Sequence, residues 1–350
     1  MKEWSDGGWN AFNSWKGLMY FEHYRAILKG EFLPPIECSV DPVNTCNLDC
    51  IYCNNKVTKA RGIMMSREHL LELFKFFKVW GAKAICIAGG GEPTLHPNLA
   101  EVVDLAYKLE MPIAMLTNGS FSGSDDLLYT CAKYMRWIGV SIDSACNGTY
   151  LKLKGRDMLD IALDNIRKLV DLGAREVTYK FLLHPYNQNE VYKAIETAHE
   201  IGCHRIHIRP MSFMNFQDKE EKYDIDSINE QVSKGRVYES DRFRIYYIQH
   251  KYNKDLHRKF GFKKCLATPI MPVFHANGDI SICIDRKNDP SMVIGTHEPV
   301  ENIKNVWGSQ RHKDVINNVK LEECPKCTFQ PYQQQIEKAV IENKCDWQFT

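Results

Sequence analysis

Between residues 36 and 212, short apolar runs typical of β-strands alternate with amphipathic helical stretches. Strands joined by helices of this length pair in parallel, with right-handed crossovers. The six strand candidates are IECSVDP (36–42), KAICIAGG (83–90), PIAMLTNG (112–119), MRWIGVSID (135–143), EVTYKFLLH (176–184) and RIHIRPM (205–211). Six such units predict an α/β fold, a partial (β/α)6 TIM-like barrel, whose chemistry lies at the carboxyl ends of the strands.

The rest of the chain lacks this alternation. Aromatic and aliphatic residues at helical spacing end at Gly30 and predict a helix capping the domain that follows. Asn277-Gly278, between two short apolar runs, predicts a hairpin. We therefore expect an N-terminal helix, the barrel, a connector or lid, a small C-terminal domain and a mostly helical tail, over residues 1–35, 36–212, 213–264, 265–330 and 331–350.

The cysteine content and the net charge limit the class of protein. The N-terminal segment does not resemble a signal peptide and no run of eighteen apolar residues occurs, so we expect a cytoplasmic protein without a membrane partner. In a reducing compartment, 13 cysteines indicate metal ligation or catalysis rather than disulfides. A formal net charge of +1 argues against a globally basic nucleic-acid binder.

Three cysteines follow the first predicted strand closely. Cys46, Cys50 and Cys53 have the spacing C-x3-C-x2-C, with Tyr52 just before the third. Thiolates favour zinc or iron–sulfur clusters. A structural zinc ion needs a fourth ligand nearby, whereas a cluster with three protein ligands leaves one iron open to a small molecule. The spacing therefore favours a catalytic iron–sulfur site, with a zinc knuckle as the alternative.

This loop resembles that of the radical S-adenosylmethionine (SAM) enzymes, which have this cysteine spacing and an aromatic residue before the third cysteine. The resemblance implies a [4Fe–4S] cluster whose open iron is chelated by SAM. It also implies an external one-electron reductant such as flavodoxin or ferredoxin. One-electron cleavage of SAM would then give a 5′-deoxyadenosyl radical that abstracts hydrogen from an unactivated carbon.

The same resemblance assigns further cofactor-binding residues. CIAGGGEPTLHP (86–97) is similar to the family's glycine-rich segment that binds the SAM amino group. Short polar residues at later strand ends suit the ribose hydroxyls, although Asn118 and Asp143 could instead cap the next helix or turn. Arg156 could pair with the SAM carboxylate, and Lys154 stands nearby. The predicted SAM site comprises Tyr52, Gly90, Gly91, Glu92, Pro93, Asn118, Ser141, Asp143 and Arg156.

A second group of cysteines lies in the C-terminal region. It resembles the SPASM domain of radical SAM enzymes in its shortened, twitch-like version, because the last cysteines of the full pattern are missing. The resemblance implies an auxiliary [4Fe–4S] cluster that transfers electrons, and a zinc ribbon is the alternative. Cys345 could be a fifth ligand, a hydrogen donor or neither. The predicted ligands are Cys265, Cys283, Cys324 and Cys327.

Basic residues give the clues to the substrate. Alternation puts Lys180 and Leu182 on one face of their strand, and His207 and Arg209 on one face of theirs. We expect Lys180 and Arg209, with Cys345, to serve catalysis. Residues 241–264 are basic and rich in aromatic residues. Such a segment could grip phosphates or bases, or could be an ordinary solvated surface.

These features together predict a radical SAM enzyme, an oxidoreductase or isomerase. Its substrate would be a sugar, cyclitol or nucleotide-like small molecule, a phosphorylated one among the candidates, and the outcome dehydrogenation or epimerisation. Modification of a ribosomally made peptide is the first alternative. Action on a nucleotide or nucleic acid is the second, with nucleic acid not favoured. A zinc-binding interaction module is the non-enzymatic alternative.

Overall fold

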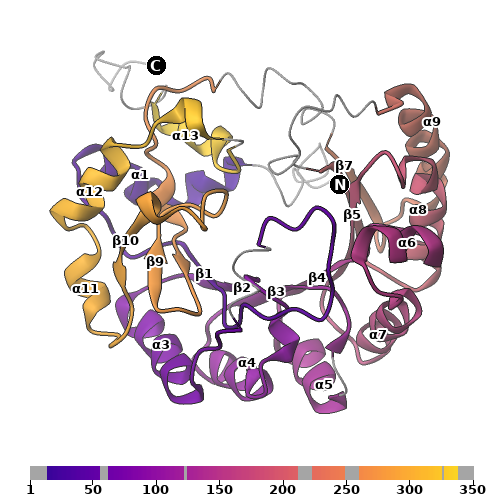
Figure 1. Cartoon of the computed structure of the whole chain (residues 1–350), viewed down its shortest axis with the longest axis horizontal. Helices are drawn as coiled ribbons and strands as arrows, with labels where there is room; N and C mark the ends of the chain where they lie inside the picture. The colour runs from indigo at the N-terminus through magenta and orange to yellow at the C-terminus, as the bar shows by residue number, and fades with distance from the viewer. Residues whose placement is uncertain are drawn as a thin grey trace, which may run out of the picture.

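The architecture rests on one continuous ten-stranded sheet. In the computed structural model, which describes residues 14–55, 62–121, 124–211, 223–248, 260–324 and 327–337, the strand order is β10-β9-β8-β1-β2-β3-β4-β5-β6-β7. The sheet curves into an open barrel with helices around its outside (Figure 1). None of the helices in these residues is both long and apolar enough to span a membrane.

The six predicted strands are all present and pair in parallel. They are β1 (Glu37–Val40), β2 (Ala84–Ile87), β3 (Ile113–Thr117), β4 (Trp137–Ser141), β5 (Val177–Leu183) and β6 (Arg205–Pro210). The helices between them are α3 (Arg67–Trp80), α4 (Leu99–Lys108), α5 (Asp125–Tyr134), α6 (Asn147–Lys154), α7 (Leu159–Asp171) and α8 (Val191–Glu200), with 3-10 turns at Pro93–Leu95 and Gln188–Glu190. The partial-barrel prediction is confirmed.

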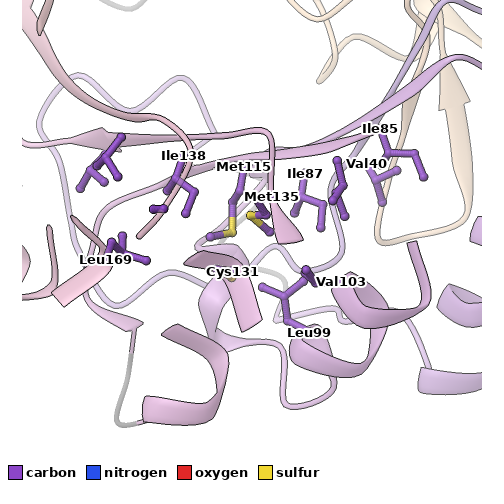
Figure 2. Close-up of a cluster of buried hydrophobic side chains, with 14 of the residues drawn as sticks. Val40, Ile85, Ile87, Leu99, Val103, Met115, Cys131, Met135, Ile138 and Leu169 are labelled. Carbon is purple, nitrogen blue, oxygen red and sulfur yellow. The ribbon is translucent and has the colours of Figure 1, made fainter. Parts of the chain in front are cut away.

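Side chains alternate between the two faces of each strand, so one face forms the hydrophobic core and the other faces the barrel interior. One face of each strand carries Ile, Val, Met and Phe, which pack against the outer helices; Figure 2 shows Ile85, Ile87, Met115 and Ile138 among them. The opposite face carries smaller or polar residues such as Cys86, Gly139 and Lys180. Burial of the apolar face stabilises the sheet at roughly 25 cal/mol per Å². The polar face is left to line the barrel interior.

The predicted connector or lid at 213–264 includes regular secondary structure in its described residues, 223–248 and 260–264. It contains α9 (Ile225–Gly235), a 3-10 turn (Arg236–Tyr238) and β7 (Arg244–Tyr247), which pairs in parallel with β6. This unit was not recognised in the sequence because β7 lies at the sheet edge, among basic and aromatic residues. An edge strand has one paired side and tolerates Arg244, which is exposed.

The C-terminal domain continues the barrel sheet rather than standing apart from it. The predicted hairpin is confirmed, because β8 (Val273–Phe274) and β9 (Asp279–Ser281) pair in antiparallel fashion and Gly278 has a φ of 90°. β8 also pairs in parallel with β1. The remaining elements are β10 (Val293–Thr296), α11 (Asn302–Val306), α12 (Gln310–Asn317), α13 (Gln330–Ile336) and 3-10 turns at Thr268–Ile270, Pro290–Met292 and Leu321–Glu323.

The N-terminal helix packs on the C-terminal domain, which the prediction of a cap on the following barrel did not foresee. The described part comprises a 3-10 helix (Ser14–Tyr20) and α1 (Phe21–Leu28). Tyr24 and Ile27 form a small core with Ile270, Phe329 and Ile336. This packing is invisible in the sequence because the partners lie more than two hundred residues away.

Candidate functional site

The three-cysteine loop follows β1 and lies in the middle of the open barrel (Figure 1). Its backbone is fixed by α6, because the N–H of Asp49 donates to the carbonyl of Lys154 at 2.9 Å and that of Ile51 to Leu153 at 3.0 Å. Gly155 ends α6 with a φ of 75°. A Cβ there would lie 2.8 Å from the carbonyl oxygen of Asp49. Glycine therefore allows the close approach of α6 to the loop.

The loop presents its sulfurs to a site without burying them completely. Cys46, Cys50 and Cys53 are each half-buried. The backbone N–H of Leu48 donates to Cys46 Sγ, and that of Asn55 to Cys53 Sγ, both at 3.4 Å. Such bonds stabilise thiolates bound to iron. Burial raises the pKa of Cys50 to about 11, partly opposed by Lys154. A positively charged metal bound nearby would therefore be needed to stabilise the Cys50 thiolate.

A buried ion pair lies beneath this loop. Asp143 Oδ2 accepts a hydrogen bond from Tyr52 Oη at 2.6 Å and pairs with Lys154 Nζ at 2.5 Å. The side chains of Lys154 and Asp143 are 3% and 0% exposed. Burial alone would lower the pKa of Lys154, but the Asp143 carboxylate and its neighbours raise it well above its usual value. Tyr52 and Asp143 therefore serve as an internal brace between the loop, β4 and α6.

The glycine-rich segment contacts the cysteine loop directly. The N–H of Gly91 donates to the carbonyl of Val43 at 2.8 Å, and a Cβ on Gly91 would lie 1.9 Å from Thr45 O. Pro93 begins the 3-10 turn that follows. The buried Glu92 carboxylate accepts four hydrogen bonds within the protein, from Thr94 N, Thr94 Oγ1, Thr117 Oγ1 and Asn118 N. Its side chain is committed to holding this turn against β3.

The other predicted SAM-site residues divide into two groups. Asn118 lies at the cysteine loop, where its Nδ2 donates to Asn47 Oδ1 at 2.7 Å. Ser141 ends β4, and its carbonyl accepts from Lys154 Nζ at 3.0 Å. Arg156, by contrast, is exposed beyond the end of α6. Lys154 and not Arg156 is thus the cation that the structure brings to the loop.

All four C-terminal cysteines line one small pocket of about 20 Å³, together with the apolar side chains of Phe260, Phe262, Met292, Val319, Leu321 and Phe329. Gln333 Nε2 donates to Cys265 Sγ at 3.4 Å, and Arg286 Nη1 to Cys324 Sγ at 3.7 Å. Burial raises the pKa of Cys265 to about 12, and also that of Cys283.

In the described part of the chain, no three His, Cys, Asp or Glu side chains converge on the position of a single metal ion. A four-iron cluster does not require such convergence, because each thiolate binds its own iron.

Lys180 and Arg209 lie on neighbouring parallel strands, with Arg209 opposite Leu182 and therefore two residues further along than Lys180. Burial and then the nearby Arg209 guanidinium lower the pKa of Lys180 to about 8. The Nε of Arg209 is buried and has no hydrogen-bond partner within the described residues. Burial lowers the pKa of Arg209, and the carboxylates of Asp285, two residues after Cys283, and Asp143 oppose this only in part. Arg209 therefore lies within electrostatic reach of Asp143, beneath the cysteine loop, and of Asp285, near Cys283.

Comparison with known protein families decides what the barrel is. Residues 40–198 match the family model described as the radical SAM superfamily. The barrel of this chain is a radical SAM domain. The predicted superfamily is confirmed, and with it the cofactors of that superfamily, SAM and iron–sulfur. The chain is a radical SAM enzyme with a further C-terminal domain.

Relatives of this radical SAM enzyme include two proteins named for nucleotide chemistry. A probable GTP 3′,8-cyclase of Saccharolobus islandicus is 27% identical over 215 residues, which cover 59% of this chain and 68% of the relative. A protein of Flammeovirga pacifica, named an S-adenosylmethionine-dependent nucleotide dehydratase, is 34% identical over 126 residues, covering 35% and 42% of the two chains.

Two solved structures share the fold over most of the radical SAM chain. Streptococcus suis SuiB bound to its precursor peptide SuiA has a TM-score of 0.68 at 17% identity, covering 98% of this chain and 82% of SuiB. The protein anSMEcpe with bound AdoMet and a peptide has a TM-score of 0.61 at 16% identity, covering 86% and 88%. At these identities the likeness shows the fold, including the C-terminal part, and not the substrate.

Several residues that shape this site of the radical SAM enzyme could not be identified from the sequence. Lys154 was considered only as a partner of the SAM carboxylate, yet it pairs with the carboxylate of Asp143. Lys287 and Asn288 contact the glycine-rich segment and the cysteine loop from the C-terminal domain, and no motif marks them. Of the basic segment, residues 249–259 lie outside the described residues, as does Cys345, so both predictions remain predictions.

Proposed function

We propose that Cys46, Cys50 and Cys53 hold a [4Fe–4S] cluster and that SAM binds between this cluster and the glycine-rich segment. The donor set fits, because three half-buried thiols share one loop whose N–H groups donate to two of the sulfurs. The peptide groups of Gly90 and Gly91 are the contacts we expect for SAM, since the Glu92 carboxylate is used internally. When bound, cluster and SAM supply a 5′-deoxyadenosyl radical that abstracts hydrogen from carbon.

The second cysteine group fits an auxiliary cluster. Four thiols line one small pocket together with several apolar side chains. Four thiolates complete the ligation of a [4Fe–4S] cluster, so this cluster would transfer electrons and not bind substrate. Arg286 and Gln333 donate toward two of the sulfurs, and these hydrogen bonds would tune the reduction potential of the cluster. A bound zinc ion here would instead support the zinc-ribbon alternative.

The substrate we propose is a small molecule with an anionic group, a phosphate being favoured over a carboxylate. The observation that carries this is the pair Lys180 and Arg209 on the barrel interior, with the buried Arg209 Nε unsatisfied within the described residues. A buried donor without a partner costs free energy unless a ligand accepts its hydrogen bond. Arg209 can bind two anion oxygens through its planar fork, and Lys180 adds a second charge.

We propose that the reacting carbon lies near the centre of the barrel. A Cβ on Gly139 would lie 2.9 Å from Lys180 Cδ, so glycine leaves room for the lysine stem to lie across β4. We propose dehydrogenation or epimerisation of a nucleotide-like, sugar or cyclitol compound as the reaction. The nucleotide chemistry named for two relatives supports the nucleotide class. Action on a peptide is the alternative reaction.

Replacing Arg209 with Met is expected to raise the KM for the anionic substrate by about tenfold or more, because truncating one partner of a buried charged contact costs at least 2 kcal/mol. SAM cleavage without substrate should stay within about twofold. Arg205 on the same strand, paired with Glu176 at 2.7 Å, gives the matched control Arg205→Met. Steady-state kinetics with a nucleoside triphosphate and the corresponding nucleoside would test this. Equal KM changes for both compounds would contradict an anion site.

Lys180 should make the KM for an anionic substrate depend on pH. Its pKa is lowered to about 8, so the ammonium is present below that pH and is lost above it. The KM for an anionic substrate should therefore rise between pH 7 and 9 in the wild type. In Lys180→Met the KM should be high throughout and its slope with pH should be smaller. A wild-type KM that is flat over this range, at constant cluster content, would argue against a role for Lys180.

A further inference from the structure

Four consecutive residues, Arg286 to Asp289, connect the two cysteine sites; we call them the 286–289 segment. Arg286 Nη1 donates toward Cys324 Sγ at 3.7 Å. Lys287 Nζ donates to the carbonyl of Gly89 at 2.7 Å, at the start of the glycine-rich segment. Asn288 Nδ2 donates to the carbonyl of Asn54 at 2.8 Å, next to Cys53. Three adjacent side chains thus reach the auxiliary pocket, the glycine-rich segment and the cysteine loop.

Lys287 is the centre of this connection. It pairs with Asp41 Oδ2 at 2.9 Å, and the two side chains are only 10% and 1% exposed. Burial alone would raise the pKa of Asp41, but Lys287 and His275 lower it to about 2. Asp41 directly follows β1 and precedes the cysteine loop. Lys287 therefore has one well-defined position, since moving it would strand a buried carboxylate.

Asn55 continues the connection to the cluster ligand. Its backbone N–H donates to Cys53 Sγ at 3.4 Å, and its side-chain Nδ2 donates to the same Gly89 carbonyl that Lys287 contacts, at 2.9 Å. Asn288 also lies 3.3 Å from Asn55 Oδ1. The separation between the glycine-rich segment and Cys53 is thus held by groups from the C-terminal domain as well as by the barrel.

At the other end, Arg286 is held in place by carboxylates. Its Nε and Nη2 donate to Asp289 Oδ2 at 3.0 and 2.5 Å, and Nη2 lies 3.4 Å from Glu323 Oε2. Glu323 directly precedes Cys324. A change in the position of Cys324 is therefore transmitted to Arg286 by a side-chain contact and by the chain itself.

We propose that the 286–289 segment couples the auxiliary cysteine site to the SAM site. Cluster-bound Cys324 fixes Arg286, and Lys287 and Asn288 then set the distance between the glycine-rich segment and Cys53, where SAM binds. These are positioning residues, and the inference rests on the proposed function. Because coupling between sites is reciprocal, SAM also slows the loss of auxiliary iron to a chelator.

A double-mutant cycle on SAM binding to the anaerobically reconstituted holoenzyme tests this coupling. Lys287→Met and Cys324→Ala should each raise the Kd for SAM about tenfold, which is 1.4 kcal/mol. The double variant should bind no more weakly than the weaker single variant, because both changes cut the same connection. Lys287→Arg should restore most of the affinity. Lys304→Met, on the exposed face of α11, is the matched control.

Two readouts besides affinity keep the outcomes distinct. In the wild type, SAM should change the electron paramagnetic resonance spectrum of the loop cluster and slow chelation of auxiliary iron, and Lys287→Met should lose the second effect. Should Lys287→Met fail to fold, Asn288→Ala removes the Asn54 contact without burying a charge. Kd changes that multiply in the double variant, or a Lys287→Met Kd within twofold of wild type, would overturn the coupling. A wild type that does not bind SAM would overturn the proposed function itself.

Discussion

Replacing Cys46, Cys50 and Cys53 together with Ala should abolish SAM cleavage and remove about half of the iron. The reconstituted wild type should hold about eight irons, because three and four cysteines are available for two [4Fe–4S] clusters. Without the loop thiolates the first cluster cannot bind, whereas the auxiliary pocket is built from other residues. Iron analysis and chromatography of 5′-deoxyadenosine after reduction would measure both effects.

The control for this change is Cys146→Ala. Cys146 is exposed, lies just before α6 and belongs to neither cysteine group, so iron content and SAM cleavage should remain at wild-type levels. Retention of SAM cleavage by the triple variant would show that the loop is not the cluster site. Loss of all iron from it would show instead that the two cysteine groups do not bind independently.

Replacing Lys154 with Met should destabilise the protein by about 3–5 kcal/mol, the cost of leaving a buried charge without its partner. The Asp143 carboxylate would keep its hydrogen bonds from Tyr52 Oη and Leu182 N but would lose its counter-ion. Thermal unfolding of the metal-free protein should show a fall in Tm of at least about 5 °C. SAM cleavage should also fall, since the brace that holds Tyr52 next to Cys53 is weakened.

Two variants make this prediction specific. Lys108→Met removes an ion pair with Asp104 in which the lysine side chain is 70% exposed, so it should change stability by less than about 1 kcal/mol. Asn fits the φ of 59° at position 143, so Asp143→Asn added to Lys154→Met should recover part of the loss. A Tm of Lys154→Met equal to that of the wild type would mean that the buried pair contributes no net stability.

The barrel could be predicted because its strands are buried and its helices amphipathic, so each unit has a clear pattern. β7 was not predicted, because its aromatic residues were grouped with the neighbouring lysines and arginines as one basic, aromatic segment. The docking of α1 on the C-terminal domain depends on Tyr24 and Phe329 meeting in space. No local pattern encodes such a contact.

The site was predictable where a motif is local and unpredictable where it depends on distant partners. The three loop cysteines lie within eight residues, so the sequence alone shows their resemblance to the radical SAM pattern. Tyr52 and Asp143 were expected to face a ligand, yet they meet each other and Lys154 across 91 residues of sequence. Lys287 and Gly89 are 198 residues apart, and only the continuous sheet through β8 and β1 brings them together.

Transfer of deuterium from substrate to 5′-deoxyadenosine tests the central claim most directly. The reduced enzyme would be incubated with SAM and a nucleoside triphosphate deuterated on its ribose. The matched deuterated nucleoside and a deuterated peptide would be run at the same concentration. We expect deuterium in 5′-deoxyadenosine from the phosphorylated compound, and much less from the other two, because Lys180 and Arg209 favour an anion. SAM cleavage that yields deuterated 5′-deoxyadenosine only with the peptide would contradict the proposed substrate site.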